Sequence, residues 1–409
     1  MNLPVPGTKF SIETFGCTAN TGDTMKMRAI LRKSSHVIVE EHEAEVVIVN
    51  TCTVTKRTEL NVLKRLNELK QQGKEVIVAG CMAAAQPELV RSILGDDVAL
   101  VTPRDICSSK EQEFDFDGLI STIPISMGCT GNCTYCIVKR ARGELKSYSP
   151  EKIRDAVKNA VDKGAKEIRI TAQDCSAYGL DRADIKLPEL LKSVTAVHGE
   201  FRVRVGMMNP STLLPILDDV LDAFDSEKIF KFFHVPVQSG SDRVLNDMKR
   251  NYKIDEFVDL VATIRHRFEY CTISTDFIIG FPTETETEFL VSLNLLERVK
   301  PEKVNITRFS PRPMTEAAKQ KDLLEREKKR RSRIISDMYH KLAIATNKEL
   351  EGTAITVLVT EKGKKGGVIA RDCAYRTVVL KADLPLGSYF PVRINEARST
   401  YLIGEVKNI

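Results

Sequence analysis

Apolar and polar positions follow two alternating periods along the first hundred residues. Lys9–Thr14, Val46–Asn50 and Glu75–Ala79 have the length and composition of strands, and the continuous apolar run at Val46–Asn50 is typical of a strand buried on both faces. Between these strands, Asp23–Lys33 and Thr55–Gln72 carry apolar residues at helical spacing. This alternation predicts a parallel α/β sheet.

The alternation returns after residue 118 and predicts about six further strand–helix units. The expected strands are Leu119–Ser126, Glu167–Ala172, Phe201–Val205, Phe230–Val237, Thr272–Ile279 and Lys303–Phe309. The expected helices are Pro150–Lys163, Leu187–Val197, Leu213–Phe224, Asp242–Met248, Ile254–Arg267 and Glu284–Val299. Such a series predicts a partial, TIM-like (β/α)6 barrel with its reactive site at the C-terminal ends of the strands.

The last part of the chain changes character. Lys321–Leu350 is expected to be one long helix, and its charged run Glu325–Arg333 is either a solvated face or a surface that contacts a nucleic-acid backbone. Five short β-rich runs follow, separated by Gly and Asp: Ala354–Thr360, Gly367–Ala370, Arg376–Leu380, Tyr389–Ile394 and Ser399–Val406. They predict a small antiparallel β-barrel.

These patterns divide the 409 residues into three domains, 1–118, 119–349 and 350–409, with the acidic stretch Glu111–Asp117 before the first boundary. A hydrophobic content of 42% and a charged content of 29% are typical of a globular protein. The first seven residues lack the charged and apolar segments of a signal peptide, and no apolar run has membrane-spanning length. We expect a cytoplasmic protein without a membrane partner.

The net charge of +5 is unevenly distributed. Residues 1–118 carry 14 Lys and Arg against 17 Asp and Glu, whereas residues 350–409 carry 9 against 6. A polyanion would therefore meet the middle and the tail of the chain more readily than the N-terminal part. Taken alone, the imbalance is equally compatible with a solvated face.

Three of the ten cysteines lie in one short loop, at the spacing Cys-x3-Cys-x2-Cys: Cys129, Cys133 and Cys136. Three thiolates this close can hold three irons of a 4Fe–4S cube, which leaves the fourth iron open to chelate a small molecule through an amine and a carboxylate. A structural zinc site usually has four ligands, and the loop contains no fourth Cys or His. Zinc and disulfides remain the alternatives.

A second triplet is spread over the N-terminal domain. Cys17, Cys52 and Cys81 each follow the C-terminal end of a predicted strand, the edge at which ligands gather in open parallel sheets. Three thiolates converging there would hold a second cube, again with one open iron. The alternative is three unrelated buried cysteines. The remaining cysteines are interpreted as reduced structural thiols: Cys107, Cys175, Cys271 and Cys373.

On these residues the chain resembles the radical S-adenosylmethionine (SAM) methylthiotransferases along essentially its whole length. The aromatic Tyr135 before the last loop cysteine fits that resemblance, and residues 350–409 resemble the RNA-binding, OB-like TRAM barrel. Four further strings carry the likeness: Arg204-Val-Gly-Met-Met-Asn-Pro210, His234-Val-Pro-Val-Gln-Ser-Gly-Ser241, Thr275-Asp-Phe-Ile-Ile-Gly-Phe-Pro282 and Ser310-Pro-Arg-Pro313.

The Gly-Met-x-Asn-Pro part of the first string points to the archaeal and eukaryotic branch that acts on N6-threonylcarbamoyladenosine in tRNA. There are two departures from the family pattern. Thr283 stands where many relatives have Gly, and Met314-Thr315-Glu316 replaces a more usual Gly-Thr-Pro. Neither departure touches the six cysteines of the two triplets.

The resemblance implies a methylthiotransferase with two 4Fe–4S clusters that acts at C2 of N6-threonylcarbamoyladenosine, at position 37 in the tRNA anticodon loop. SAM bound at the Cys129 cluster would be reduced to methionine and a 5′-deoxyadenosyl radical, which activates C2. The Cys17 cluster would carry the sulfur, and a second SAM would methylate it. An electron donor and a sulfur donor, both unidentified, would be further partners.

The expected SAM or substrate contacts are side chains near the predicted strand ends: Tyr135, Gln173, Asp174, Arg204, Gln238 and Ser239. Arg204 would meet a carboxylate of cofactor or substrate, and His234 is interpreted as a packed strand residue. In the C-terminal barrel, the expected RNA contacts are Lys362, Lys364, Lys365, Arg371, Arg376 and Arg393, with Tyr375 and Tyr401 as stacking candidates.

Two alternatives of different kinds remain open from the sequence. One is the same chemistry on isopentenyladenosine in tRNA or on an aspartate of a ribosomal protein. The Gly-Met-Met-Asn-Pro string and the basic tail argue against both substrates. The other is a non-catalytic RNA-binding protein with structural metal sites. Its iron and sulfide content and its lack of SAM cleavage would distinguish it.

Overall fold

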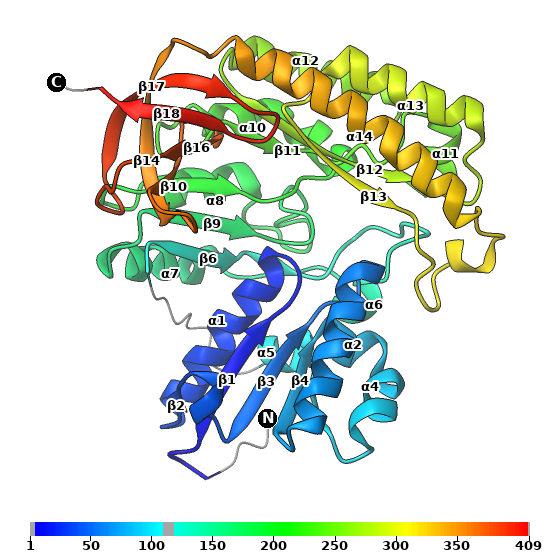
Figure 1. Ribbon diagram of the computed structural model, residues 1–409, viewed down its shortest axis with the longest axis vertical. Helices are drawn as coiled ribbons and strands as arrows, with labels where there is room; N and C mark the ends of the chain where they lie inside the picture. Colours follow the sequence, from blue (N-terminus) through cyan, green and yellow to red (C-terminus); the bar gives the residue numbers. More distant parts are fainter. Residues whose placement is uncertain (1–4, 109–117, 408–409) are drawn as a thin grey trace.

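The computed structural model describes residues 5–108 and 118–407, which form three units in sequence order (Figure 1). The N-terminal unit contains a parallel sheet, the central unit a partial barrel and the C-terminal unit a small closed barrel. The fold class predicted from the sequence is confirmed. The acidic stretch Glu111–Asp117, predicted to separate two domains, lies outside the described residues. Within the described ranges, no helix is long and apolar enough to cross a membrane.

The N-terminal sheet has five strands, all paired in parallel in the order β2-β1-β3-β4-β5. The strands are β1 (Lys9–Thr14), β2 (Val37–Ile38), β3 (Val46–Thr51), β4 (Glu75–Gly80) and β5 (Ala99–Val101). All six residues of β3 are buried, as its apolar run predicts. Helices α1 (Thr18–Lys33) and α5 (Pro103–Ser108) cover one face, and α2 (Lys56–Gln71) and α4 (Pro87–Leu94) cover the other.

Helix α1 begins at Thr18, directly after Cys17, and not at the predicted Asp23. Its first turns lack an apolar period because they bury polar side chains, including Asn20 and Asp23, against the central unit. Glycine at position 22 is required by the same contact, since an added Cβ would lie 2.4 Å from a side-chain atom of Pro124. The start of α1 was missed because this polar face is an interface between units.

The central unit has six parallel strands, as predicted. They are β6 (Ile120–Pro124), β9 (Glu167–Thr171), β10 (Arg202–Val205), β11 (Phe232–His234), β12 (Thr272–Ile279) and β13 (Lys303–Arg308). The outer helices are α7 (Pro150–Asp162), α8 (Leu187–Thr195), α10 (Leu217–Phe224), α11 (Asp242–Asp247), α12 (Ile254–Arg267) and α13 (Glu286–Val299). Parallel bridges Val203–Ile229 and Met207–His234 join the two three-stranded halves, while β6 and β13 remain edge strands.

Two predicted elements of the central unit are interrupted at proline. The expected strand Leu119–Ser126 ends as β6 at Pro124, and β7 (Ser126–Met127) then pairs antiparallel with β8 (Lys146–Ser147). The expected helix Leu213–Phe224 is split into α9 (Pro210–Leu213), a 3-10 turn at Leu214–Ile216 and α10. Pro215 lies in that turn, and proline lacks the N–H that a continuous helix needs.

The C-terminal unit is a closed barrel in the order β14-β15-β16-β18-β17. Its strands are β14 (Ala354–Lys362), β15 (Val368–Arg371), β16 (Thr377–Leu380), β17 (Tyr389–Ala397) and β18 (Leu402–Val406). Four of the five strand pairs are antiparallel, and β16 with β18 is parallel. The barrel is fixed to the central unit: the Lys231 N–H donates to the Cys373 carbonyl over 2.8 Å, and the Tyr375 hydroxyl donates to Glu167 over 2.5 Å.

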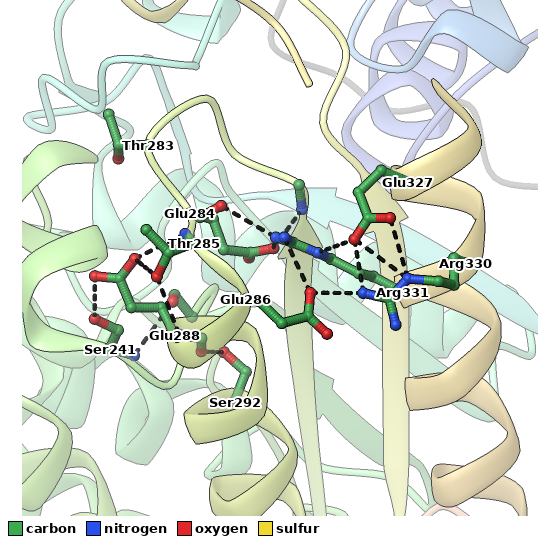
Figure 2. A network of polar contacts seen from close by, with 12 residues as sticks. Ser241, Thr283, Glu284, Thr285, Glu286, Glu288, Ser292, Glu327, Arg330 and Arg331 are labelled. Atoms are coloured by element: carbon green, nitrogen blue, oxygen red, sulfur yellow. Dashed lines mark hydrogen bonds and ion pairs between the residues drawn. The ribbon is translucent and has the colours of Figure 1, made fainter. Parts of the chain in front are cut away.

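Helix α14 (Glu325–Lys348) links these two units and runs along the central unit (Figure 1). Its charged first half is neither wholly solvated nor wholly free for RNA. The buried Arg331 guanidinium lies 2.6 Å from the buried Glu284 carboxylate, within the network that Figure 2 shows. The buried Lys328 ammonium donates to the Phe309 carbonyl over 3.0 Å, and its stem packs on Gly280. Part of the run therefore clamps the ends of β12 and β13.

Candidate active site

The loop that carries Cys129, Cys133 and Cys136 is closed at its base by the β7–β8 ribbon. Gly128 enters it with a φ of +82°, and an added Cβ would lie 2.0 Å from the Glu144 carbonyl oxygen. Only glycine fits this position. The Gln173 side-chain oxygen, at the end of β9, accepts a hydrogen bond from the Gly128 N–H over 2.7 Å. The predicted residue Gln173 thus holds the loop backbone.

Two of the three loop thiols lie close to Gly131. The point that a Cβ on Gly131 would occupy lies 3.4 Å from the Cys129 sulfur and 3.8 Å from the Cys133 sulfur. Backbone N–H groups of Gly131 and Val138 donate to Cys129 and Cys136 over 3.3 and 3.4 Å. Burial, reinforced by the neighbouring Cys133, raises the pKa of the Cys136 thiol to about 12. A bound cation is therefore needed to make these ligands thiolates.

A buried arginine, which sequence reasoning missed, lies beside this triplet. One Arg250 Nη atom is 3.7 Å from the Cys133 sulfur, and the other donates to the Pro236 carbonyl over 3.0 Å. Arg250 follows α11 in a segment without any local motif, so the sequence gives no signal for it. Its positive charge therefore lies directly beside a candidate cluster ligand.

The N-terminal triplet gathers at the C-terminal edge of its sheet, as predicted. An added Cβ on Gly16 would lie 3.1 Å from the Cys52 sulfur, so the absent side chain makes room for that thiol. Cys17 caps α1 and its thiol donates to Asn20 over 3.5 Å. Burial raises the pKa of Cys52 to about 12, and the charges of Cys81 and Cys17 contribute in the same direction. The three cysteines follow the C-terminal ends of β1, β3 and β4, which are neighbours in the sheet.

The two triplets are neighbours across the contact between the N-terminal and central units. Cys81 packs in one apolar cluster with Ile137, the residue that follows Cys136. Arg142, in α6 (Val138–Arg142), donates to Asn20 over 3.3 Å and interacts with the Cys81 thiol. No role for Arg142 was predicted from the sequence.

Donor chemistry and spacing in both triplets fit a thiolate-bound iron–sulfur cube with one open iron. Within residues 5–108 and 118–407, however, no three or more His, Cys, Asp and Glu side chains already converge as a metal-ligand set. Holding a cluster would therefore require the thiols to turn toward a common centre. The glycines at positions 16 and 131 leave space beside them.

Two other predicted contacts belong to the same region. Tyr135 is partly buried against Val244, Met248 and Phe281. Asp174 is buried, and its carboxylate accepts hydrogen bonds from the Asn209 N–H (3.0 Å) and from two hydroxyl groups, those of Ser176 and Thr212 (both 2.7 Å). Asp174 therefore joins the end of β9 to the Asn-Pro turn after β10.

Gln238 and Ser239 lie in the buried turn after β11. Gln238 has a φ of +71°, and its backbone pairs with β12: its N–H donates to the Asp276 carbonyl over 2.7 Å. The Ser239 hydroxyl accepts from the Ser241 N–H over 3.2 Å. His234, at the end of β11, lies 3.1 Å from both Asp276 carboxylate oxygens, a paired residue of the barrel interior. Gln238 and Ser239 thus follow the C-terminal end of β11.

The predicted RNA contacts fall into two groups. Arg371, Arg376 and Tyr375 face the central unit: Arg376 donates to the Cys271 carbonyl over 3.2 Å, and Tyr375 packs on Phe230. The outer group is exposed and lies on the C-terminal barrel: Lys362, Lys364, Lys365, Arg393 and Tyr401.

Comparison with known protein families gives the same three-part division of the chain as the structure. Residues 123–296 match the radical SAM superfamily, residues 9–101 match the uncharacterized protein family UPF0004, and residues 348–407 match the TRAM domain. A radical SAM methyltransferase, TsrM from Kitasatospora setae, has a similar fold, with a TM-score of 0.58 and 11% identity over 76% of this chain and 77% of that one. Fold and site together define a radical SAM protein.

Relatives are similar over the full length. A probable threonylcarbamoyladenosine tRNA methylthiotransferase of Archaeoglobus fulgidus is 39% identical, covering 97% of this chain and 98% of its own. The corresponding Pyrococcus horikoshii protein is 40% identical over 97% and 99%. A Drosophila melanogaster threonylcarbamoyladenosine tRNA methylthiotransferase is 33% identical over 98% and 78%. The chain belongs to this threonylcarbamoyladenosine tRNA methylthiotransferase family, as the sequence motifs indicated.

Proposed function

We propose that this protein is a radical SAM enzyme that converts N6-threonylcarbamoyladenosine at position 37 of tRNA into its 2-methylthio derivative. The observation that carries the proposal is the adjacency of two cysteine triplets: Cys81 belongs to the same apolar cluster as Ile137, the residue that follows Cys136. One triplet lies in a radical SAM domain and the other at a strand edge of the N-terminal sheet. Two thiolate sites so placed can serve one substrate base between them.

The residues present fit two 4Fe–4S clusters, one on Cys129, Cys133 and Cys136 and one on Cys17, Cys52 and Cys81. When bound, these groups and SAM supply the radical and sulfur chemistry that no protein side chain provides at an unactivated C–H bond. The reaction also needs an electron donor and a sulfur donor.

The protein's own residues orient these sites. Gln173 holds the entry of the cluster loop at Gly128, and Arg250 places a positive charge beside Cys133. Arg142 sits between the triplets and fixes the loop helix to α1. Tyr135, Asp174, Arg204, Gln238 and Ser239 remain the proposed SAM or substrate contacts.

The tRNA would be bound by the C-terminal barrel, next to the mouth of the central barrel. An anticodon-loop base is single-stranded and can be turned out of its stack at low cost. Support for the threonylcarbamoyl form of that base comes from relatives that cover nearly the whole chain. A non-catalytic RNA-binding protein would not need two adjacent thiol triplets beside a partial barrel.

Nucleoside mass spectrometry of tRNA from a strain that lacks the gene tests the proposal. We expect 2-methylthio-N6-threonylcarbamoyladenosine to disappear, its unthiolated precursor to accumulate, and the wild-type gene to restore the product. Persistence of the product in the deletion strain would contradict the proposal. The same digest reports isopentenyladenosine derivatives, whose loss would identify the sister activity.

A further inference from the structure

A cavity of 580 Å³ extends from the N-terminal unit to the C-terminal barrel and passes along the interior of the central barrel. Thr18, the residue after Cys17, lines it at one side, and Tyr375 and Tyr401 of the C-terminal barrel line it at another. Strand residues Arg204 and Lys303 line it from β10 and β13. The cavity thus begins beside a cluster cysteine and is large enough for a nucleoside.

The lining of this cavity is strongly cationic. Five of its lining side chains are Lys or Arg: Arg169, Arg204, Lys303, Arg371 and Arg376. Among the described lining residues, Glu302 is the only carboxylate, and it already binds Arg265 over 3.0 Å and the Ile273 N–H over 2.7 Å. The cavity therefore has positive charge that its own lining does not neutralise.

Three of the cations have partners outside the lining. Arg169 pairs with Glu167 over 2.6 Å, Arg371 with Glu361 over 3.2 Å, and Arg376 with Asp372 over 3.7 Å. The Glu167 carboxylate is shared, since it also accepts from the Tyr375 hydroxyl. The Arg169 pair lies in β9 and is joined to the C-terminal barrel through Tyr375, whereas the other two pairs lie within that barrel.

Arg204 and Lys303 differ from the other three. Across the part of the chain that the structure describes, neither side chain makes a hydrogen bond or ion pair. Both are held over the ring of Phe232, the Arg204 guanidinium at 4.9 Å and the Lys303 ammonium at 6.0 Å from its centroid. Burial lowers the pKa of each, and for Lys303 the nearby Arg204 and Arg371 add to the effect. Two clustered, unpaired cations favour an anion between them.

We propose that Arg204 and Lys303 bind the free carboxylate of the threonylcarbamoyl group, and that this pair selects the acid-bearing adenosine against neutral N6-substituted ones. The inference rests on the proposed function and deepens it. A carboxylate presents two oxygens in a plane, which the forked guanidinium of Arg204 matches. A phosphate of the RNA backbone is the other possible anion.

The test uses full-length protein and anticodon stem–loop RNA that carries either N6-threonylcarbamoyladenosine or its methyl ester. The two RNAs have the same phosphates and differ only at the threonyl carboxyl group, which is a charged carboxylate in one and a neutral methyl ester in the other. We expect the wild type to bind the acid form about 10- to 100-fold more tightly than the ester, as for a charged hydrogen-bonded pair. Arg204→Gln and Lys303→Gln should bind both RNAs with nearly equal affinity.

Matched controls are Arg298→Gln and Lys158→Gln, exposed residues on the outer helices α13 and α7. They should retain the preference for the acid form. The far-UV circular dichroism and thermal unfolding of Arg204→Gln and Lys303→Gln should match those of the wild type, which shows that both variants fold.

The outcomes separate the two hypotheses. A wild type that does not distinguish acid from ester, or variants that keep the preference, would overturn the carboxylate assignment. Equal loss of affinity for both RNAs in the variants would assign the cations to phosphate and overturn it as well. An acid preference that is present in a protein forming no 2-methylthio product would sustain this inference and refute the proposed function.

Discussion

The Arg142 guanidinium lies 2.6 Å from the Asp23 carboxylate, and both side chains are only 4% exposed. The pair crosses between units, from the helix that follows the cluster loop to the first helix of the N-terminal unit. Because Arg142 also interacts with the Cys81 thiol, one buried ion pair sets the relative position of the two triplets.

Removal of one partner from this pair should destabilise the protein. Asp23→Ala leaves the Arg142 charge buried and unpaired, which should lower the free energy of unfolding by about 3–5 kcal/mol. Arg142→Met in the same chain should recover part of that loss, because no uncompensated charge then remains. Urea denaturation of the single and double variants measures both effects. A single variant as stable as the wild type would show that the pair does not fix the interface.

The two triplets should have separable roles. Cys133→Ala should abolish reductive SAM cleavage, which is measured as 5′-deoxyadenosine formation. Cys52→Ala should retain that cleavage but insert no sulfur into the RNA. Product formation by Cys52→Ala would show that the N-terminal triplet is not a sulfur-carrying site.

Iron content should report the number of clusters. Anaerobically prepared wild type should contain about eight irons and an equal amount of acid-labile sulfide per chain, as two cubes require. A chain with Cys17, Cys52 and Cys81 all changed to Ala should contain about four irons. If the wild type also holds only four, the second cluster is absent.

Gly128 should be essential for the cluster loop because the backbone passes close to it, and Gly164 provides a matched control. Gly128→Ala would place a Cβ 2.0 Å from the Glu144 carbonyl oxygen, so the loop backbone would have to move. We expect SAM cleavage to fall by at least about tenfold, because the free-energy cost of the left-handed backbone alone corresponds to a factor of that order. Gly164→Ala has a similar φ of +97° but nothing within 4 Å of its Cβ. This control should retain cleavage; if both variants behave alike, the close contact is irrelevant.

Adjacent arginines on α14 should differ in their effect on stability. Arg331→Met would leave the buried Glu284 carboxylate without its 2.6 Å partner and should cost about 3–5 kcal/mol of unfolding free energy. Arg330→Met removes a neighbour whose ion pairs with Glu286 and Glu327 are exposed, and it should change little (Figure 2). Thermal unfolding of the two variants side by side gives the comparison. Equal shifts in melting temperature would mean that burial does not distinguish the contributions of the two arginines to stability.

Much of the fold follows from local patterns. The buried strand Val46–Thr51, the helix Ile254–Arg267 and the strand Thr272–Ile279 each have a periodicity that predicts them to within one residue. Misplaced boundaries have tertiary causes. Helix α1 starts at Thr18 because its first turns bury polar side chains against another unit, and Lys328 and Arg331 turn inward from a run that looks solvated.

The class of chemistry follows from the sequence alone, because Cys129, Cys133 and Cys136 lie within one loop. Their short spacing keeps the three residues near one another whatever the fold of the rest of the chain. The sequence also placed Cys17, Cys52 and Cys81 at strand ends, since parallel strands end at a common edge. Only the tertiary structure decided which residues meet across units. Packing of the N-terminal unit on the central unit brings Arg142 to Asp23. Curvature of the central sheet brings Arg204 and Lys303, which are also far apart in the chain, to the same ring of Phe232.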